Sequence, residues 1–259
     1  EGYTYVPNDN FEQALIDLGY DDVLDNYVVT DSINSVTSLD VGEKEISDLT
    51  GIEDFTALTI LSCGQNQLTS LDVSSNTALT ILSCRNNQLT SLDVSTNTSL
   101  TSLRCYDNQL TSLDVSANTA LTYLYCYTNQ LAALDVSANT ALTLLTCSIN
   151  ELTALDVSNN TALTTLYCRS NQLTALDVSA NTALTSLNCR NNQLTYLNMK
   201  NGVTDALTTF NATNNDSLTC IETLDPDYAT ANWTYANGNI DDGVIFSVIC
   251  GLTITAIAD

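Results

Sequence analysis

Apolar and polar residues follow each other along this chain in a 21-residue unit that repeats over about residues 58–200. By its constant positions the unit reads L-T-x-L-x-C-x-x-N-Q-L-T-x-L-D-V-S-x-N-T-A. Cysteine marks it at a fixed interval, at Cys63, Cys84, Cys105, Cys126, Cys147, Cys168 and Cys189. An internal repeat of this length predicts a solenoid, in which each unit forms one coil stacked on the next.

Each unit has two halves, and each half has apolar residues two positions apart, Leu61 with Cys63 and then Leu71 with Val73 in the first copy. This alternation indicates a short strand with one buried face. The sequence therefore predicts two strands per coil and two parallel sheets along the rod. Each half ends in an asparagine, a residue that favours turns and bonds nearby backbone through its amide. Leu39 extends the pattern backwards, so we expect the stack to begin there.

The residues before the repeat predict a helical cap over the open end of the core. Phe11, Leu15 and Leu18 have helical spacing behind Asn10, which we predict as the N-cap, and Gly19 suits the position after the last turn. An acidic patch follows, which we interpret as a solvated surface, with a Ca²⁺ site as the alternative; its members are Asp21, Asp22, Asp25 and Asp31.

The residues after the repeat predict a second cap. Cys220 and Cys250 lie outside the cysteine ladder, and we predict a disulfide between them that staples a β-rich C-terminal cap. Asn237 and Gly238 indicate a hairpin turn inside it. We expect residues 252–259 to begin a linker or a further domain.

The predicted organisation has three parts. Residues 1–35 form the N-terminal helical cap, residues 36–215 the solenoid, and residues 216–259 the C-terminal cap and tail.

The motif L-x-x-L-x-C-x-x-N-x-L resembles a leucine-rich-repeat segment. With its nested halves and its cysteine on the first strand, the unit is similar to the internalin group, specifically to members with a cysteine ladder. Residues 5–17 (Y-V-P-N-D-N-F-E-Q-A-L-I-D) resemble leucine-rich-repeat proteins secreted by marine Bacteroidetes. The resemblance implies a β-rich solenoid with a parallel sheet on its concave side. It also implies a surface-exposed binding or adhesion module whose ligand contacts that side.

The net charge of the chain argues against some classes of partner. Thirty acidic residues against six basic ones give a net charge of -24, so the chain has no basic patch for binding nucleic acid through phosphates. Self-repulsion favours a soluble monomer. No apolar run approaches the roughly 20 residues of a transmembrane helix. The predicted disulfide fits an extracellular, secreted or cell-surface location.

Two columns of chemically reactive residues, one of cysteine and one of aspartate, are interpreted as structural. The cysteines occupy the place that the second half gives to valine, and no histidine or carboxylate shares their column, so we expect buried, reduced thiols rather than metal or redox sites. The second half carries an outward aspartate ladder, for which we expect hydrogen bonding to serine or backbone, with a row of bound cations as the alternative. The ladder comprises Asp72, Asp93, Asp114, Asp135, Asp156 and Asp177, with Asn198 in the seventh place.

The positions that flank leucine and cysteine on the first strand vary while the rest of the unit repeats. They hold every arginine of the chain and five of its twelve tyrosines. These residues are Arg85, Arg104, Arg169, Arg190, Tyr106, Tyr123, Tyr125, Tyr127 and Tyr167. Tyrosine and arginine dominate binding hot spots, so we predict a ligand-binding face; a surface tuned for strand propensity and solubility is the alternative.

The predicted function is non-enzymatic recognition of a protein or surface ligand on the concave side. The alternative is binding of an acidic polysaccharide, with tyrosine rings stacking on sugars and arginines pairing with acidic groups. We expect no catalysis and no cofactor, because the sequence has no histidine, no exposed free cysteine and no glycine-rich phosphate loop.

Overall fold

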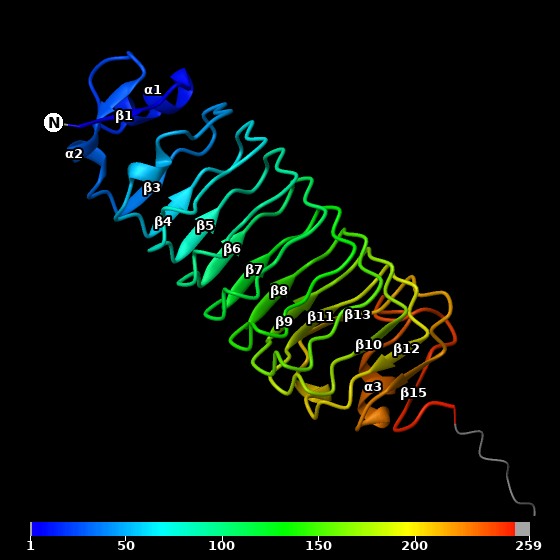
Figure 1. Cartoon of the computed structure of the whole chain (residues 1–259). Helices are drawn as coiled ribbons and strands as arrows, with labels where there is room; N and C mark the ends of the chain where they lie inside the picture. The colour runs from blue at the N-terminus through cyan, green and yellow to red at the C-terminus, as the bar shows by residue number, and fades with distance from the viewer. Residues whose placement is uncertain (1, 252–259) are drawn as a thin grey trace, which may run out of the picture.

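The computed structural model describes residues 2–251, which form a rod of stacked coils with a cap at each end (Figure 1). The predicted solenoid is confirmed. The predicted tail, residues 252–259, lies outside the described residues. No helix in the described part of the chain has the length and apolar character needed to cross a membrane.

The main sheet contains nine parallel strands in the order β3-β4-β5-β6-β7-β8-β9-β11-β13. Their bounds are β3 Ser38–Asp40, β4 Ile60–Ser62, β5 Ile81–Ser83, β6 Ser102–Arg104, β7 Tyr123–Tyr125, β8 Leu144–Thr146, β9 Thr165–Tyr167, β11 Ser186–Asn188 and β13 Thr209–Asn211. Leu39 is in register with Leu61, which confirms that the stack begins at β3. Because the register matches the repeat, the inward leucines and cysteines form continuous buried columns.

Asparagine side chains hold successive coils together at the end of this strand segment. The amide of Asn108 donates to the carbonyl oxygens of Cys84 and Cys105, both at 3.1 Å, and its Oδ1 accepts from the backbone N–H of Leu89 at 3.0 Å. One buried side chain thus binds three backbone groups from two adjacent coils, which confirms the predicted role of this ladder.

The coil also turns at a left-handed residue two positions after each ladder cysteine and, in the last coil, two positions after Ala212; these turns were not predicted from the sequence. The φ angles lie between 52° and 57° at Gln65, Asn86, Asp107, Thr128, Ile149, Ser170, Asn191 and Asn214. Asparagine tolerates this conformation, whereas β-branched Thr128 and Ile149 do so at a cost.

The prediction of two sheets along the whole rod is wrong. The second sheet has four parallel strands near the C-terminal end, β10 (Ala175–Asp177), β12 (Tyr196–Asn198), β14 (Cys220–Glu222) and β15 (Ile245–Ser247). Within the described chain, the equivalent residues 71–73, 92–94, 113–115, 134–136 and 155–157 form no strand.

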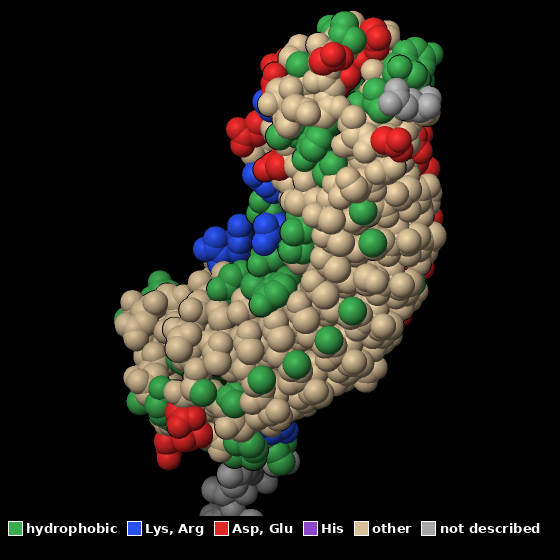
Figure 2. Space-filling view, turned by 90° about the vertical axis from the view of Figure 1, so that its left-hand side faces the viewer, with side chains coloured by type: hydrophobic (Ala, Val, Ile, Leu, Met, Phe, Trp, Pro, Cys, Tyr) green, Lys and Arg blue, Asp and Glu red, His purple; other side chains and the backbone are tan. Residues whose placement is uncertain are grey.

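Curvature accounts for this difference. The rod is hollowed on one side (Figure 2), so its coils spread apart on the opposite side. Backbone groups there leave hydrogen-bond range, while longer side chains still bridge the gap. Asn97, for example, donates to the carbonyl oxygens of Val73 and Asn76, both at 3.0 Å.

The N-terminal cap contains two helices and a two-stranded sheet. These are β1 (Tyr3–Tyr5), α1 (Asp9–Asp17), β2 (Tyr27–Val29) and α2 (Thr30–Ile33), and the 3-10 turn η1 (Ile52–Asp54) follows β3.

Helix α1 starts earlier than predicted. Its N-cap is Asn8, which accepts from the N–H of Phe11 at 3.0 Å, whereas Asn10 lies inside the first turn and donates to the carbonyl of Glu45. Both asparagines suit a cap, so sequence alone chose wrongly between them. Gly19 has φ 79°, as expected of the residue after the helix.

The C-terminal cap contains η2 (Thr204–Ala206) and the helix α3 (Pro226–Asn232), in addition to β14 and β15. The predicted disulfide between Cys220 and Cys250 is confirmed. The hairpin predicted at Asn237 and Gly238 is wrong, because β14 and β15 run parallel and α3 precedes that turn.

The C-terminal cap also closes the last edge of the main sheet. The carbonyl of Asn239 accepts from Ala212 N–H at 2.8 Å, and its amide donates to Phe210 O at 2.8 Å. The carboxylate of Asp241 accepts from the N–H groups of Asn214 and Asn215, both at 2.9 Å.

Candidate ligand-binding face

Three columns of outward side chains cover the main sheet. Column one precedes the buried leucine of each strand, column two lies between leucine and cysteine, and column three follows the cysteine. The candidate residues fall in these columns: Tyr123 in column one; Arg104, Tyr125 and Tyr167 in column two; and Arg85, Tyr106, Tyr127, Arg169 and Arg190 in column three. On the hollowed side of the rod, basic and hydrophobic side chains gather in the middle (Figure 2).

The central coils bring five of these residues together. The rings of Tyr106 and Tyr127 are stacked, with centroids 4.3 Å apart and planes 11° apart. The guanidinium of Arg85 lies 5.9 Å from the Tyr106 centroid, and that of Arg104 lies 5.5 Å from the Tyr125 centroid. The structure therefore contains two cation–π contacts beside a stacked aromatic pair. We call these five residues the central cluster.

A glycine makes room for the first arginine of the cluster. A Cβ atom at Gly64 would lie 2.8 Å from Cγ of Arg85, so the Arg85 side chain occupies the space above Gly64. The sequence analysis missed this role of Gly64. The signal was available, because Gly64 is the column-three residue of the coil before Arg85.

Burial and a neighbouring hydroxyl shift the pKa of one member of the stacked tyrosine pair, Tyr127. Burial, followed by the nearby Tyr106 hydroxyl, raises the pKa of Tyr127 to about 12. The phenol therefore stays neutral at physiological pH and keeps its proton available for hydrogen bonding.

The arginines of this face have no carboxylate partners. The ion pairs formed within residues 2–251 are Lys44 with Asp17 and Lys200 with Glu222. Arg85 reaches an acid only indirectly: it donates to Asn86 at 3.2 Å, and Asn86 donates to Asp107 at 3.2 Å.

Two arginines lie apart from the central cluster. Arg169 and Arg190 occupy column three in adjacent coils and are half-buried. The Nε atom of Arg190 is buried and has no hydrogen-bond partner among the described residues. Tyr167 stands in column two of the Arg169 coil, and its hydroxyl shares a 2.9 Å hydrogen bond with Ser186 in the Arg190 coil. We call Arg169 and Arg190 the distal pair.

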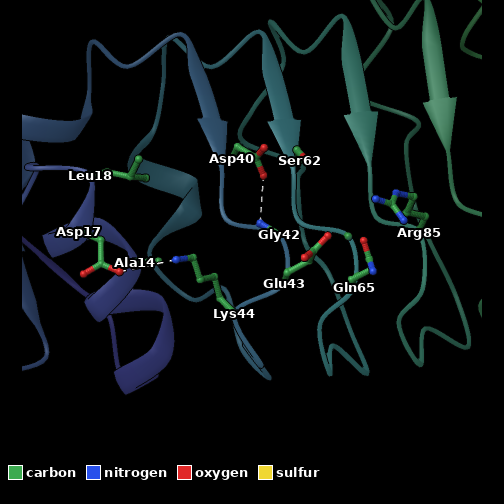
Figure 3. Close-up of a pocket in the computed structure, with 11 residues that line it drawn as sticks. Ala14, Asp17, Leu18, Asp40, Gly42, Glu43, Lys44, Ser62, Gln65 and Arg85 are labelled. Atoms are coloured by element: carbon green, nitrogen blue, oxygen red, sulfur yellow. Dashed lines mark hydrogen bonds and ion pairs between the residues drawn. The ribbon is translucent and has the colours of Figure 1, made fainter.

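A hollow of about 610 Å³ lies at the N-terminal end of the same face (Figure 3). Gly42 and Gly64 leave the space, Arg85 lies on one side, and the Lys44–Asp17 ion pair at 3.6 Å lies on the other. The sequence analysis missed this hollow because it depends on the way the cap helix packs beside the first coils.

The two ladders with a structural interpretation behave as expected. The seven cysteines are free and fully buried, and burial raises the pKa of the Cys84, Cys147 and Cys189 thiols to about 12. Asp93 accepts from the N–H of Ser95 at 2.9 Å, and hydrogen bonds from Ser95 lower the Asp93 pKa. No group of three or more metal-binding side chains converges within residues 2–251.

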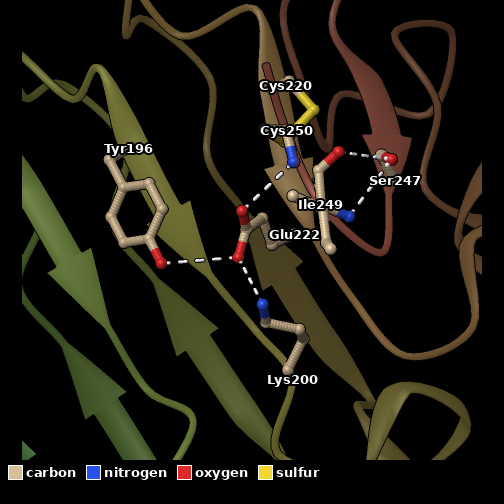
Figure 4. The surroundings of a disulfide bond; sticks show 7 residues. All are labelled: Tyr196, Lys200, Cys220, Glu222, Ser247, Ile249 and Cys250. Atoms are coloured by element: carbon tan, nitrogen blue, oxygen red, sulfur yellow. Dashed lines mark hydrogen bonds and ion pairs between the residues drawn. A yellow bond between two sulfur atoms is a disulfide. The ribbon is translucent and has the colours of Figure 1, made fainter. Parts of the chain in front are cut away.

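One further ionic cluster supports the disulfide (Figure 4). Lys200 lies 2.6 Å from Glu222, which also accepts from the backbone N–H of Cys250 at 3.1 Å and from the Tyr196 hydroxyl at 3.4 Å. Lys200 is the main cause of a lowered Glu222 pKa. The cluster ties Cys250 to the second sheet and belongs to the cap rather than to the face.

Comparison with known proteins supports the fold and the repeat type. No protein-family model matches the chain. Internalin J of Listeria monocytogenes is 44% identical over 72 residues, a match that spans 28% of this chain and 8% of internalin J.

Two solved structures share the fold. Internalin C2 of Listeria monocytogenes superposes with a TM-score of 0.66 at 18% identity over 94% of each chain. The leucine-rich-repeat ectodomain of a membrane receptor kinase from Arabidopsis thaliana was solved in complex with Casparian strip integrity factor 2. It gives a TM-score of 0.60 at 20% identity, over 75% of this chain and 28% of that one. The chain thus has the leucine-rich-repeat solenoid fold that its sequence predicts, and a part of it is similar to internalin J.

Proposed function

We propose that this internalin-like chain is a non-enzymatic recognition module that binds a protein or surface ligand with the tyrosine- and arginine-bearing face of its main sheet. One observation carries the proposal. All four arginines lie on this face without a carboxylate partner among residues 2–251, although the chain has thirty acidic residues. Unpaired guanidiniums beside aromatic rings are the groups from which binding hot spots are built.

The fold and the disulfide support an extracellular role. A disulfide such as that between Cys220 and Cys250 persists in oxidising surroundings, and this favours a secreted or cell-surface protein. A plant receptor ectodomain of the same fold was solved with a bound factor, so the architecture is compatible with recognition of another polypeptide.

An acidic polysaccharide is the second candidate ligand. The central cluster presents tyrosine rings next to arginines, a combination that suits sugar rings carrying acidic groups.

The test uses arrays of purified extracellular proteins and of glycans. The wild-type chain is compared with the face variant Arg104→Ser/Tyr125→Ser and with the control Tyr3→Ser/Tyr5→Ser. The control removes two tyrosines exposed at 63% and 51% on the N-terminal cap. We expect the wild type and the control to bind some of the arrayed ligands, and the face variant to lose binding to those same ligands. A chain that binds no spot, or a face variant that keeps every spot, contradicts the proposal.

A further inference from the structure

Column three presents cations at two places along the rod, with aromatic rings between them. In successive coils it reads Arg85, Tyr106, Tyr127, Ser148, Arg169 and Arg190. At a strand spacing of about 4.8 Å, the first arginine is about 19 Å from the distal pair, and the two members of the pair are about 5 Å apart.

We propose that column three is the binding track of an acidic polysaccharide, and that Arg169 and Arg190 together hold one sulfate or carboxylate group of that chain. The proposal rests on the proposed function and names the ligand class for the same face. The stacked tyrosines then lie against sugar rings, while Arg85 and Arg104 meet further acidic groups.

The distal pair has the features of an oxyanion site. Two like charges in adjacent coils repel, and no described carboxylate offsets them. A buried donor without an acceptor, such as Nε of Arg190, is also unfavourable. An oxyanion between the two side chains supplies acceptors to both guanidiniums, whose forked geometry matches sulfate and carboxylate groups.

The net charge of -24 does not prevent an anionic ligand from binding here. Charges farther away than about 8 Å are largely screened at physiological ionic strength, whereas direct contacts are not. On the hollowed side, acidic side chains are seen toward the two ends, and the middle shows basic and hydrophobic ones (Figure 2).

The face suits a polysaccharide better than an acidic polypeptide. A peptide often binds by adding a strand to a free sheet edge, but Asn239 and Asp241 cover the β13 edge. Apart from tyrosine and arginine, the central coils present mainly small hydroxyl and amide side chains, such as Ser148 and Asn188. Such a surface matches a hydroxyl-rich chain with acidic groups at regular steps.

The test measures dissociation constants by calorimetry for dextran sulfate, polygalacturonate, neutral dextran and poly-L-glutamate. The variant Arg169→Gln/Arg190→Gln removes the distal pair. The control Gln109→Glu/Gln130→Glu makes the same change in net charge at exposed corners, where Glu151 stands naturally in the next coil.

We expect dextran sulfate or polygalacturonate to bind and neutral dextran not to bind. The distal-pair variant weakens binding about tenfold or more, while the control stays within about twofold. The slope of log K against log salt also becomes shallower by about one to two in the distal-pair variant, because fewer counterions are released.

Four results overturn the inference. The first two are a distal-pair variant that binds like the control and binding of neutral dextran as tight as that of the charged chains. The other two are binding of poly-L-glutamate as tight as that of both acidic polysaccharides and absence of binding to either acidic polysaccharide. The proposed function survives any of these results if the array test still finds spots that the face variant loses.

Discussion

The cysteine ladder makes the stability of this protein steeply dependent on alkaline pH. Seven thiols are fully buried, and burial raises the pKa of Cys84, Cys147 and Cys189 from 9 to about 12, with the other four also raised. Between those values the unfolded chain loses thiol protons that the folded chain keeps. Stability is therefore unaffected by the thiols below pH 9 and falls as pH rises from 9 toward 12.

The size of the effect follows from the number of thiols. Each contributes about 1.4 kcal/mol per pH unit once its unfolded form is mostly ionised. For seven thiols, the free energy of unfolding should fall by about 9 kcal/mol between pH 9.5 and 10.5. Because a typical domain has only about 5–15 kcal/mol in total, we expect unfolding near pH 10.

The assay is urea unfolding followed by circular dichroism at several pH values from 8 to 10.5, in oxygen-free buffer that leaves the disulfide intact. The variant Cys105→Ala/Cys126→Ala has two fewer thiols, so its slope against pH should be shallower by about 2.5 kcal/mol per pH unit. The control Val115→Ala loses a fully buried side chain of the same core and should keep the wild-type slope. Both variants keep every tyrosine and lysine of the wild type. Equal slopes in the cysteine variant and the wild type would refute the reasoning.

Three further predictions concern stability measured by the same urea assay near pH 7. Asn108→Ala leaves the buried N–H of Leu89 without a partner and removes one of two amide hydrogen bonds from each of the Cys84 and Cys105 carbonyls, so it should cost about 2–5 kcal/mol. The exposed neighbour Gln109→Ala should change stability by less than about 0.5 kcal/mol. Ile149→Asn relieves a β-branched residue at φ 54° and should stabilise the chain by about 1 kcal/mol; a loss would contradict the strain. Cys220→Ser/Cys250→Ser opens a loop closed across a sequence separation of 30 residues and should cost about 3–4 kcal/mol, and an unchanged midpoint would show that the ionic cluster alone holds the cap.

The features that recur in every coil could be predicted from the sequence. Inward leucine and cysteine, bridging asparagine and the start of the stack at Leu39 all follow from spacing, because each coil repeats one local environment. Features that depend on the whole assembly could not. The length of the second sheet depends on the curvature of the rod. This curvature builds up over many coils, so the sequence of a single coil does not reveal it.

The candidate face was likewise predictable from the sequence only where its features follow from the repeat. The 21-residue repeat places Tyr106 beside Tyr127 on the next coil, and the structure confirms that the two are neighbours, with their rings stacked. Alternation does not determine which way a long side chain leans, so the contact between Arg85 and the space above Gly64 needed coordinates. The absence of carboxylate partners likewise depends on where the acids lie in space.

The constant positions and the variable outward positions of the repeat have different physical roles. The bonds that join the coils run from asparagine side chains to backbone carbonyl and N–H groups, as Asn108 does with Cys84, Cys105 and Leu89. Backbone groups are the same whatever side chain stands outward, so these bonds place no demand on columns one to three. The outward residues are therefore free to vary with little cost in stability. The stacked tyrosines and the arginines above them add contacts between coils, but the asparagine ladder joins the coils without requiring these residue types, and this favours selection for a ligand.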